Sequence, residues 1–189
     1  VGAGIGATVG KARGAQSMMK SGLGIYCLAW GELKVGAVAV VNALGDIYNW
    51  KTGEKIAGLL TEDRKSFRDT VEIMYARTDV VDNKFTGNTT IGVVITNADF
   101  KKPALCKIAG MAQDGYARAI RPVHTSADGD SIYAVSVGNE TEKIKADQDL
   151  VGTLAAEVMS AAIVRAVTNA ESAYGFPAYR ELKDRENKK

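Results

Sequence analysis

The segment from residue 78 to residue 96 changes character abruptly, and this change constrains the fold more than any other feature of the sequence. Residues 78–88 are polar and rich in Asp and Asn, as is typical of an exposed linker. From Thr89 onward the chain is apolar and β-branched, which predicts a buried strand. The bond between Asn88 and Thr89 is therefore expected where an exposed segment enters the core.

This position has a chemical consequence. Cleavage before Thr89 would leave a free α-amine beside the Thr89 hydroxyl, and an adjacent N-terminal amine can activate this otherwise weak nucleophile. The reference pKa of such an amine is about 7.7–8.0, so a useful fraction is unprotonated near neutral pH. On these residues alone, an ordinary strand start with two β-branched threonines is the favoured interpretation.

Several segments, in a fixed order, carry a resemblance to a known family. They are the Gly-rich opening Gly2–Lys11, Val40–Ile47, Gly87–Ile91, Arg118–Thr125 and Asp128-Gly129-Asp130. Together they resemble the self-cleaving aminopeptidases and amidases of the DmpA family, which include the β-peptidyl aminopeptidases and the nylon-oligomer hydrolase. The resemblance implies a precursor that cleaves itself before a Ser or Thr, here between Asn88 and Thr89.

The same resemblance implies the architecture. We expect one domain over residues 1–189, of the α/β class and α+β type. Its expected form is the four-layer αββα sandwich that DmpA shares with the ornithine acetyltransferases. Self-cleavage would leave residues 1–88 as the end of an α-subunit and residues 89–189 as a β-subunit. The chain opens inside the Gly-rich motif without a Met, so we expect its natural N-terminal part to be missing.

Four further residues receive site roles from the resemblance. Lys11 is expected beside the nucleophile Thr89, Asn42 is expected to donate to the oxyanion, and Asp128 and Asp130 are expected to orient the hydroxyl and the ammonium. Each has a structural alternative. Lys11 equally fits a solvated turn, Asn42 a strand end that caps its own turn, and the two aspartates a plain turn. No further ligands flank the aspartates, so we expect no metal there.

Hydrophobic patterns predict the regular elements. Residues 22–30 and 34–42 are expected as strands joined by a turn at Gly31-Glu32, and the nearly all-apolar second strand predicts cover on both faces. Further expected elements are a short strand near 47–50, a helix within 61–76 that residues 61–64 could cap, and a helix from Lys101 that ends before Pro122. A strand over 131–137, a buried helix over 149–171 and a charged tail that frays from Ala173 complete the list.

Composition excludes several classes of function. The chain is 46% hydrophobic and 24% charged with a net charge of +2, so nothing points to nucleic acid. We expect no membrane span, a cytoplasmic location and reduced, packed thiols at Cys27 and Cys106. The pattern Gly2-x-Gly4-x-x-Ala7 lacks the βαβ setting of a dinucleotide site, so no cofactor is expected. His124, the only histidine, is expected to be structural.

These observations favour an N-terminal-nucleophile amidohydrolase that acts on small peptides or amino-acid amides. By resemblance it would assemble as a homo-oligomer, a tetramer of αβ units. One alternative is an acyltransferase of the ornithine acetyltransferase fold, although those proteins cleave between Ala and Thr, and Asn88-Thr89 fits the hydrolases better. The other alternative is an uncleaved, non-catalytic paralogue.

Overall fold

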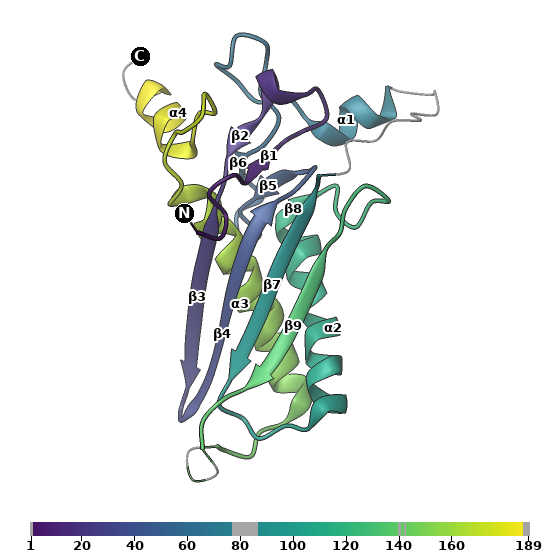
Figure 1. The fold of residues 1–189 in the computed structure, drawn as a ribbon, viewed down its shortest axis with the longest axis vertical. Helices are drawn as coiled ribbons and strands as arrows, with labels where there is room; N and C mark the ends of the chain where they lie inside the picture. Colours follow the sequence, from purple (N-terminus) through teal and green to yellow (C-terminus); the bar gives the residue numbers. More distant parts are fainter. Residues whose placement is uncertain (1, 77–86, 140, 142, 187–189) are drawn as a thin grey trace.

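A four-stranded sheet runs through the centre of the protein (Figure 1). The computed structural model describes residues 2–76, 87–139, 141 and 143–186. The strand order is β3-β4-β7-β9, with the first three strands antiparallel to their neighbours and β7 parallel to β9. Their bounds are Leu23–Trp30, Leu33–Asn42, Thr89–Thr96 and Ser131–Ser136. The predicted hairpin of β3 and β4 and the predicted strand from Thr89 are confirmed.

Two long helices cover one face of this sheet (Figure 1). Helix α2 spans Lys102–Ala119 with Pro in its first turn, and α3 spans Gln148–Thr168. The Asp147 side chain accepts the amides of Asp149 and Leu150, which fixes where α3 begins. By length and composition α3 would suffice to cross a membrane, but 72% of that apolar window is buried, as in a core helix.

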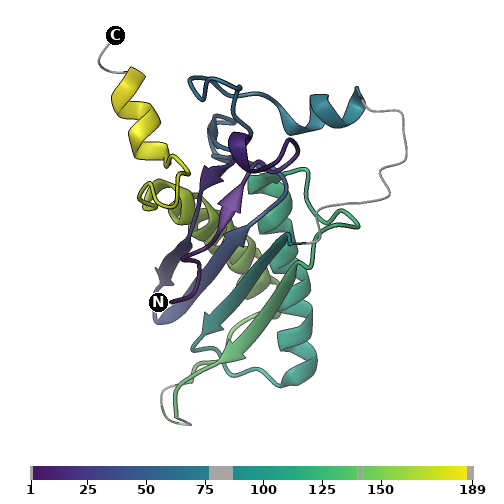
Figure 2. The same ribbon diagram turned by 45° about the horizontal axis from the view of Figure 1, so that its top comes forward.

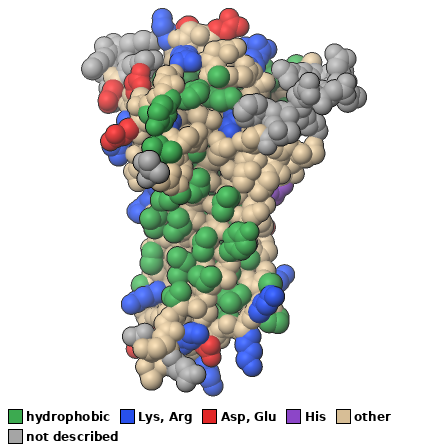
Figure 3. Space-filling model, in the orientation of Figure 1, with side chains coloured by type: hydrophobic (Ala, Val, Ile, Leu, Met, Phe, Trp, Pro, Cys, Tyr) green, Lys and Arg blue, Asp and Glu red, His purple; other side chains and the backbone are tan. Residues whose placement is uncertain are grey.

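The other face of the sheet is apolar and open in the part of the chain that the structure describes. We call it the open sheet face; its exposed side chains are Leu23, Ile25, Ile91, Tyr133 and Val135. Figure 3 shows these apolar side chains gathered over the strands. The expectation that β4 is covered on both faces is therefore wrong for the described residues, because both covering helices lie on one side. The central sheet and the two helices thus form one sheet layer and one helix layer of the αββα arrangement.

Smaller elements gather at one end of the sheet, as Figure 2 shows from a second angle. A three-stranded sheet has the order β6-β5-β8, and a two-stranded ribbon pairs β1 with β2. The bounds are β1 Thr8–Val9, β2 Met19–Lys20, β5 Asp46–Tyr48, β6 Lys55–Ala57, β8 Ile120–Arg121, the 3₁₀ turn η1 Ala15–Ser17, α1 Thr70–Tyr75 and α4 Tyr179–Glu186.

Three sequence expectations need correction. The helix expected within 61–76 begins only after Asp69, which caps it, because Thr61 and Ser66 close a separate turn through backbone hydrogen bonds. The tail expected to fray instead forms α4 over residues 179–186, where Leu182 is buried.

The cysteines are the third correction. Cys27 and Cys106 are free thiols, but both are exposed rather than packed. Strand alternation places Cys27 on the same side of β3 as Ile25, which is exposed. Cys106 lies on the side of α2 where Lys102, Pro103 and Gly110 are also exposed.

A buried carboxylate joins the small elements at this end. Asp46 is fully buried and accepts hydrogen bonds from the amides of Leu59 and Thr70, from the Thr70 hydroxyl and from Lys55 Nζ. We call these four residues the Asp46 cluster. It connects β5, β6 and the start of α1, and so sets the position from which the chain continues toward Gly87.

Candidate active site

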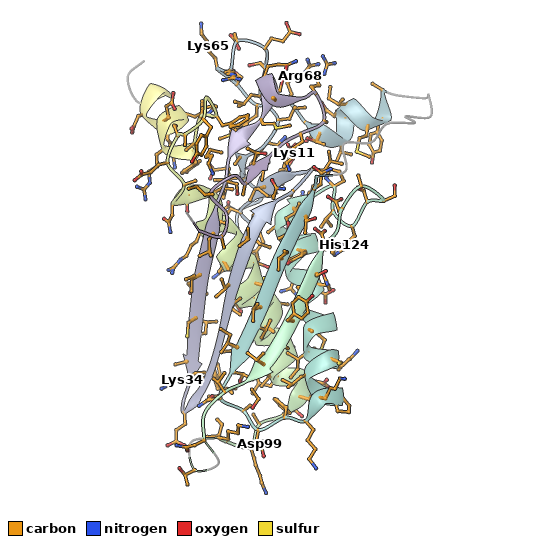
Figure 4. The ribbon with its side chains drawn as sticks, in the orientation of Figure 1. Lys11, Lys34, Lys65, Arg68, Asp99 and His124 are labelled. Carbon is orange, nitrogen blue, oxygen red and sulfur yellow. The ribbon has the colours of Figure 1, made fainter. Side chains whose placement is uncertain are left out.

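The predicted site residues meet at the end of the central strands. Asn42 is the last residue of β4 and lies directly opposite Thr89, the first residue of β7. Asn88 forms an isolated parallel bridge with Asp128 in the loop before β9. Lys11, labelled in Figure 4, lies at this same end and donates to Asn42. Strand pairing thus brings together Asn42, the Asn88-Thr89 bond and Asp128, and a side-chain hydrogen bond adds Lys11.

The Thr89 hydroxyl lies against the peptide bond that precedes it. Its Oγ1 donates to the carbonyl oxygen of Asn88 at 2.6 Å. The amide of Gly129 donates to the same oxygen at 2.9 Å. Gly129 leaves the room that the hydroxyl occupies, because a Cβ at that position would lie 2.8 Å from Thr89 Oγ1. A nucleophilic oxygen and a hydrogen-bond donor therefore converge on one carbonyl group.

The side-chain amide of Asn42 points at the carbonyl one residue further upstream. Its Nδ2 donates to the Gly87 oxygen at 2.6 Å. Its Oδ1 accepts from Lys11 Nζ at 2.7 Å and from the Thr8 amide at 3.1 Å. Because the two donors hold Oδ1, the amino group is fixed toward the site.

Lys11 is buried, with 4% of its surface exposed, so a solvated turn lysine is excluded. Its Nζ also donates to the carbonyl oxygens of Asn42 at 3.0 Å and Gly87 at 3.2 Å. The backbone amide of Lys11 donates to the carbonyl oxygen of Leu44. The preceding residue, Gly10, has a φ of 71°, which suits glycine. Burial lowers the pKa of Lys11 to about 8, and the negative charge of Asp128 opposes this shift.

The two aspartates hold the backbone around the nucleophile. Asp130 Oδ1 accepts the Thr90 amide at 2.8 Å, while Asp128 Oδ2 accepts the amide and hydroxyl of Thr125 at 2.9 and 2.6 Å. In the uncut chain Asp130 therefore binds the residue after Thr89, whereas Asp128 binds Thr125 of its own loop. Burial raises the pKa of Asp130, and the negative charge of Asp128 raises it further. The Thr90 amide and His124 act in the opposite direction and lower this pKa. No group of three or more His, Cys, Asp or Glu suited to a metal occurs among the described residues.

Sequence reasoning missed some of the groups at this site. The Gly129 amide and the Tyr116 hydroxyl, which lies 3.1 Å from the carbonyl oxygen of Thr90, have no sequence signal, because both contacts depend on tertiary placement. His124, expected to be structural, lies with Nδ1 3.0 Å from Asp130 Oδ2.

The sequence matches one protein family over most of its length. Residues 1–180 match the profile described as Peptidase family S58. An uncharacterized aminopeptidase of Mycobacterium leprae (strain TN) is 34% identical over 191 residues, covering 95% of this chain and 51% of that protein. A 6-aminohexanoate-oligomer endohydrolase of Paenarthrobacter ureafaciens is 27% identical over 178 residues, covering 87% and 49%. The chain spans about half the length of these relatives.

Solved structures share the fold. The PH0078 protein from Pyrococcus horikoshii OT3 superimposes with a TM-score of 0.62 at 17% identity over 99% of this chain and 50% of that one. The L-aminopeptidase D-Ala-esterase/amidase from Ochrobactrum anthropi, described as a variant of the Ntn hydrolase fold, gives 0.53 at 15% over 95% and 53%. The predicted α/β class is confirmed.

Proposed function

Because this chain belongs to peptidase family S58, we propose that it carries the nucleophile of an amidohydrolase that cleaves itself between Asn88 and Thr89. The mature enzyme would then hydrolyse small peptides or amino-acid amides, as an aminopeptidase or amidase. One observation carries the proposal: the Thr89 hydroxyl and the Gly129 amide lie 2.6 and 2.9 Å from the same carbonyl oxygen, that of Asn88.

The self-cleavage step follows from these positions. Thr89 Oγ1 attacks the carbonyl carbon of Asn88 and loses its proton, and the negative charge develops on the oxygen that the Gly129 amide binds. The carbon–nitrogen bond breaks, the nitrogen takes up the proton, and Asn88 becomes an ester on Thr89. Water then hydrolyses this ester, which leaves Asn88 with a carboxylate and Thr89 with a free α-amine.

The same groups would serve the hydrolysis of a substrate amide. The free α-amine of Thr89 takes the hydroxyl proton and returns it to the leaving amine. In the uncut chain the Asn42 amino group donates to the Gly87 carbonyl, which belongs to the segment that leads to the cut. Once that segment moves away, Asn42 can donate to the substrate oxyanion. One such donor typically contributes about 2.7–4 kcal/mol of transition-state stabilisation.

The test is intact-mass analysis of the full-length natural protein and its Thr89→Ala and Thr89→Ser variants. We expect wild type to give a fragment that starts Thr-Thr-Ile-Gly, Thr89→Ser to retain cleavage, and Thr89→Ala to lose both cleavage and amide hydrolysis. An active enzyme that stays as one uncut chain would contradict the proposal. Adding an amine acceptor distinguishes hydrolysis from acyl transfer, because only a transferase would convert the acceptor faster than it releases free acid.

A further inference from the structure

His124 has no role in the mechanism proposed above. It is in the loop between β8 and β9, and its side chain is 40% exposed, whereas that of Asp130 is 5% exposed. Its Nδ1 lies 3.0 Å from Asp130 Oδ2. Its ring also stacks on Tyr116 of α2, with a centroid separation of 5.8 Å and an interplanar angle of 27°. The histidine therefore contacts two groups that arrive from different elements.

Both of these groups bind the residue next to the nucleophile. Asp130 Oδ1 accepts the Thr90 amide at 2.8 Å, and the Tyr116 hydroxyl lies 3.1 Å from the Thr90 carbonyl oxygen. The backbone donor and acceptor of Thr90 are thus held by the two partners of His124. Any displacement of Asp130 or Tyr116 would shift the start of β7, and Thr89 with it.

The backbone of His124 limits which residues can replace it. Its φ is 55°, in the left-handed region, which Asn, Asp and His adopt more often than other non-glycine residues do. Asn is therefore a substitution that this backbone conformation accommodates.

We propose that His124 is a positioning residue: its Nδ1–H donates to Asp130 and so holds this carboxylate on the Thr90 amide, which fixes the Thr89 nucleophile. The inference rests on the proposed function for its effect on rate, but its structural content can be measured separately. The role is one of orientation, since His124 does not touch the Thr89 hydroxyl in the described structure.

The charges around Asp130 explain why a donor is needed. Burial disfavours its ionised form and raises its pKa, and Asp128 on the same loop adds a second negative charge. Tyr116 contributes no positive charge beside Asp130. The ammonium of Lys11 interacts with the charge of Asp128 instead. The groups that favour the carboxylate are the Thr90 amide, the charge of the His124 ring and the backbone amide of His124.

The first test measures the tautomer of His124, which is the one histidine of this 189-residue chain. In imidazole ¹⁵N NMR of the uncut full-length Thr89→Ala protein, the His124 signals are those that disappear when His124→Asn is added, and we expect the proton of the neutral ring on Nδ1. Asp130→Asn should move it to Nε2, because the Asn amino group then donates to Nδ1. Asp149→Asn, on the exposed first turn of α3, is the control and should change nothing.

Two outcomes would overturn the proposal: a neutral ring protonated at Nε2 in the parent, or a tautomer unchanged by Asp130→Asn in a folded protein. If Asp130→Asn does not fold, the tautomer of the parent decides alone. Neither result depends on activity, so failure of the proposed function is recognised separately.

The second test concerns rate. His124→Phe keeps a ring on Tyr116 but loses the donor, and we expect kcat to fall about 10- to 100-fold with KM nearly unchanged. His124→Asn places an amide N–H near the position of Nδ1 and suits the backbone, so it should recover most of the rate. Equal rates for the Phe and Asn variants at matched thermal stability would contradict the role. An inactive wild type with the expected tautomer would refute only the proposed function.

Discussion

Lys11 is buried among carbonyl oxygens. Its titration should therefore change the free energy of unfolding with pH. The pKa of Lys11 is lowered from its ordinary 10.5 to about 8, mainly by burial. Between these values the unfolded chain binds a proton that the folded chain does not, so stability should rise with pH. Below pH 8 Lys11 is protonated in both the folded and the unfolded chain, and the stability gained at higher pH is absent.

Urea unfolding of wild type and Lys11→Met at pH 7 and pH 10 measures this contribution. Met has a similar shape and cannot titrate. We expect the stability of wild type relative to Lys11→Met to increase with pH, up to about 3 kcal/mol for a shift of this size. A constant difference across the range would show that Lys11 keeps its ordinary pKa.

Gly129 is a second residue whose effect can be isolated. A Cβ there would lie 2.8 Å from Thr89 Oγ1, so Gly129→Ala should push the hydroxyl away from the Asn88 carbonyl. We expect self-cleavage to slow at least about tenfold, followed by mass spectrometry over time. Gly110→Ala is the control, because its Cβ would meet nothing within 4 Å. Equal slowing in both variants would remove the steric argument.

At the level of elements, the Asp46 cluster holds β5, β6 and α1 together. Asp46→Ala would leave the buried amides of Leu59 and Thr70 without their acceptor. It would also remove the closest carboxylate partner of Lys55, whose ammonium keeps only Asp69 at 3.4 Å and the Arg68 carbonyl oxygen. Breaking a buried pair on one side typically costs about 3–5 kcal/mol. We expect a loss of that size in urea unfolding.

The exposed Asp99 provides the matched control. Its carboxylate lies 3.9 Å from Lys143 Nζ and its side chain is 65% exposed. Surface pairs contribute about 0–1 kcal/mol, so Asp99→Ala should have little effect. Similar losses for the two variants would mean that the Asp46 cluster is not a special support.

Local patterns were sufficient for the large elements but not for the contacts between them. The β3–β4 hairpin, the start of α2 at its proline and the apolar stripe of α3 follow from short-range rules, and all three are confirmed. The start of α1 was misplaced, because Asp69 rather than Thr61 caps it. The tail was expected to fray, because the buried contact of Leu182 is invisible in a charged segment.

The candidate site shows the same division. Its five residues came from motif resemblance, and the pairing of Asn42 with Thr89 could not be read locally, since register between distant strands depends on the whole sheet. The sequence predicts a structural role for His124, because an N-terminal Thr needs no histidine as its base. Its contact with Asp130 becomes visible only when the loop before β9 is placed. The polar segment 78–88 lies largely outside the described residues.

For the whole molecule, the open sheet face should control behaviour in solution. Ile25 and Tyr133 are 55% and 62% exposed. Figure 3 shows apolar side chains gathered over this part of the molecule. Soluble monomers rarely expose large contiguous apolar patches. We expect this 189-residue chain to bind the dye ANS and to self-associate, and the pair Ile25→Lys and Tyr133→Lys to weaken both effects.

ANS fluorescence and sedimentation velocity provide the measurements. Tyr75→Lys is the control, because Tyr75 is 80% exposed but lies at the end of α1, outside the central sheet. A parent chain that stays monomeric and binds no dye would contradict the expectation.

The place of β7 between β4 and β9 gives the proposed cut a kinetic consequence. A new chain start at Thr89 would leave β3 and β4 on one polypeptide and β7 and β9 on the other, within a single sheet. The uncut chain can regain its fold alone at any dilution. The cut molecule, once unfolded and separated, must find its partner again, so its recovery depends on concentration. Unfolding of the cut enzyme at low concentration would then be irreversible. Its lifetime would depend on the rate at which the two chains dissociate.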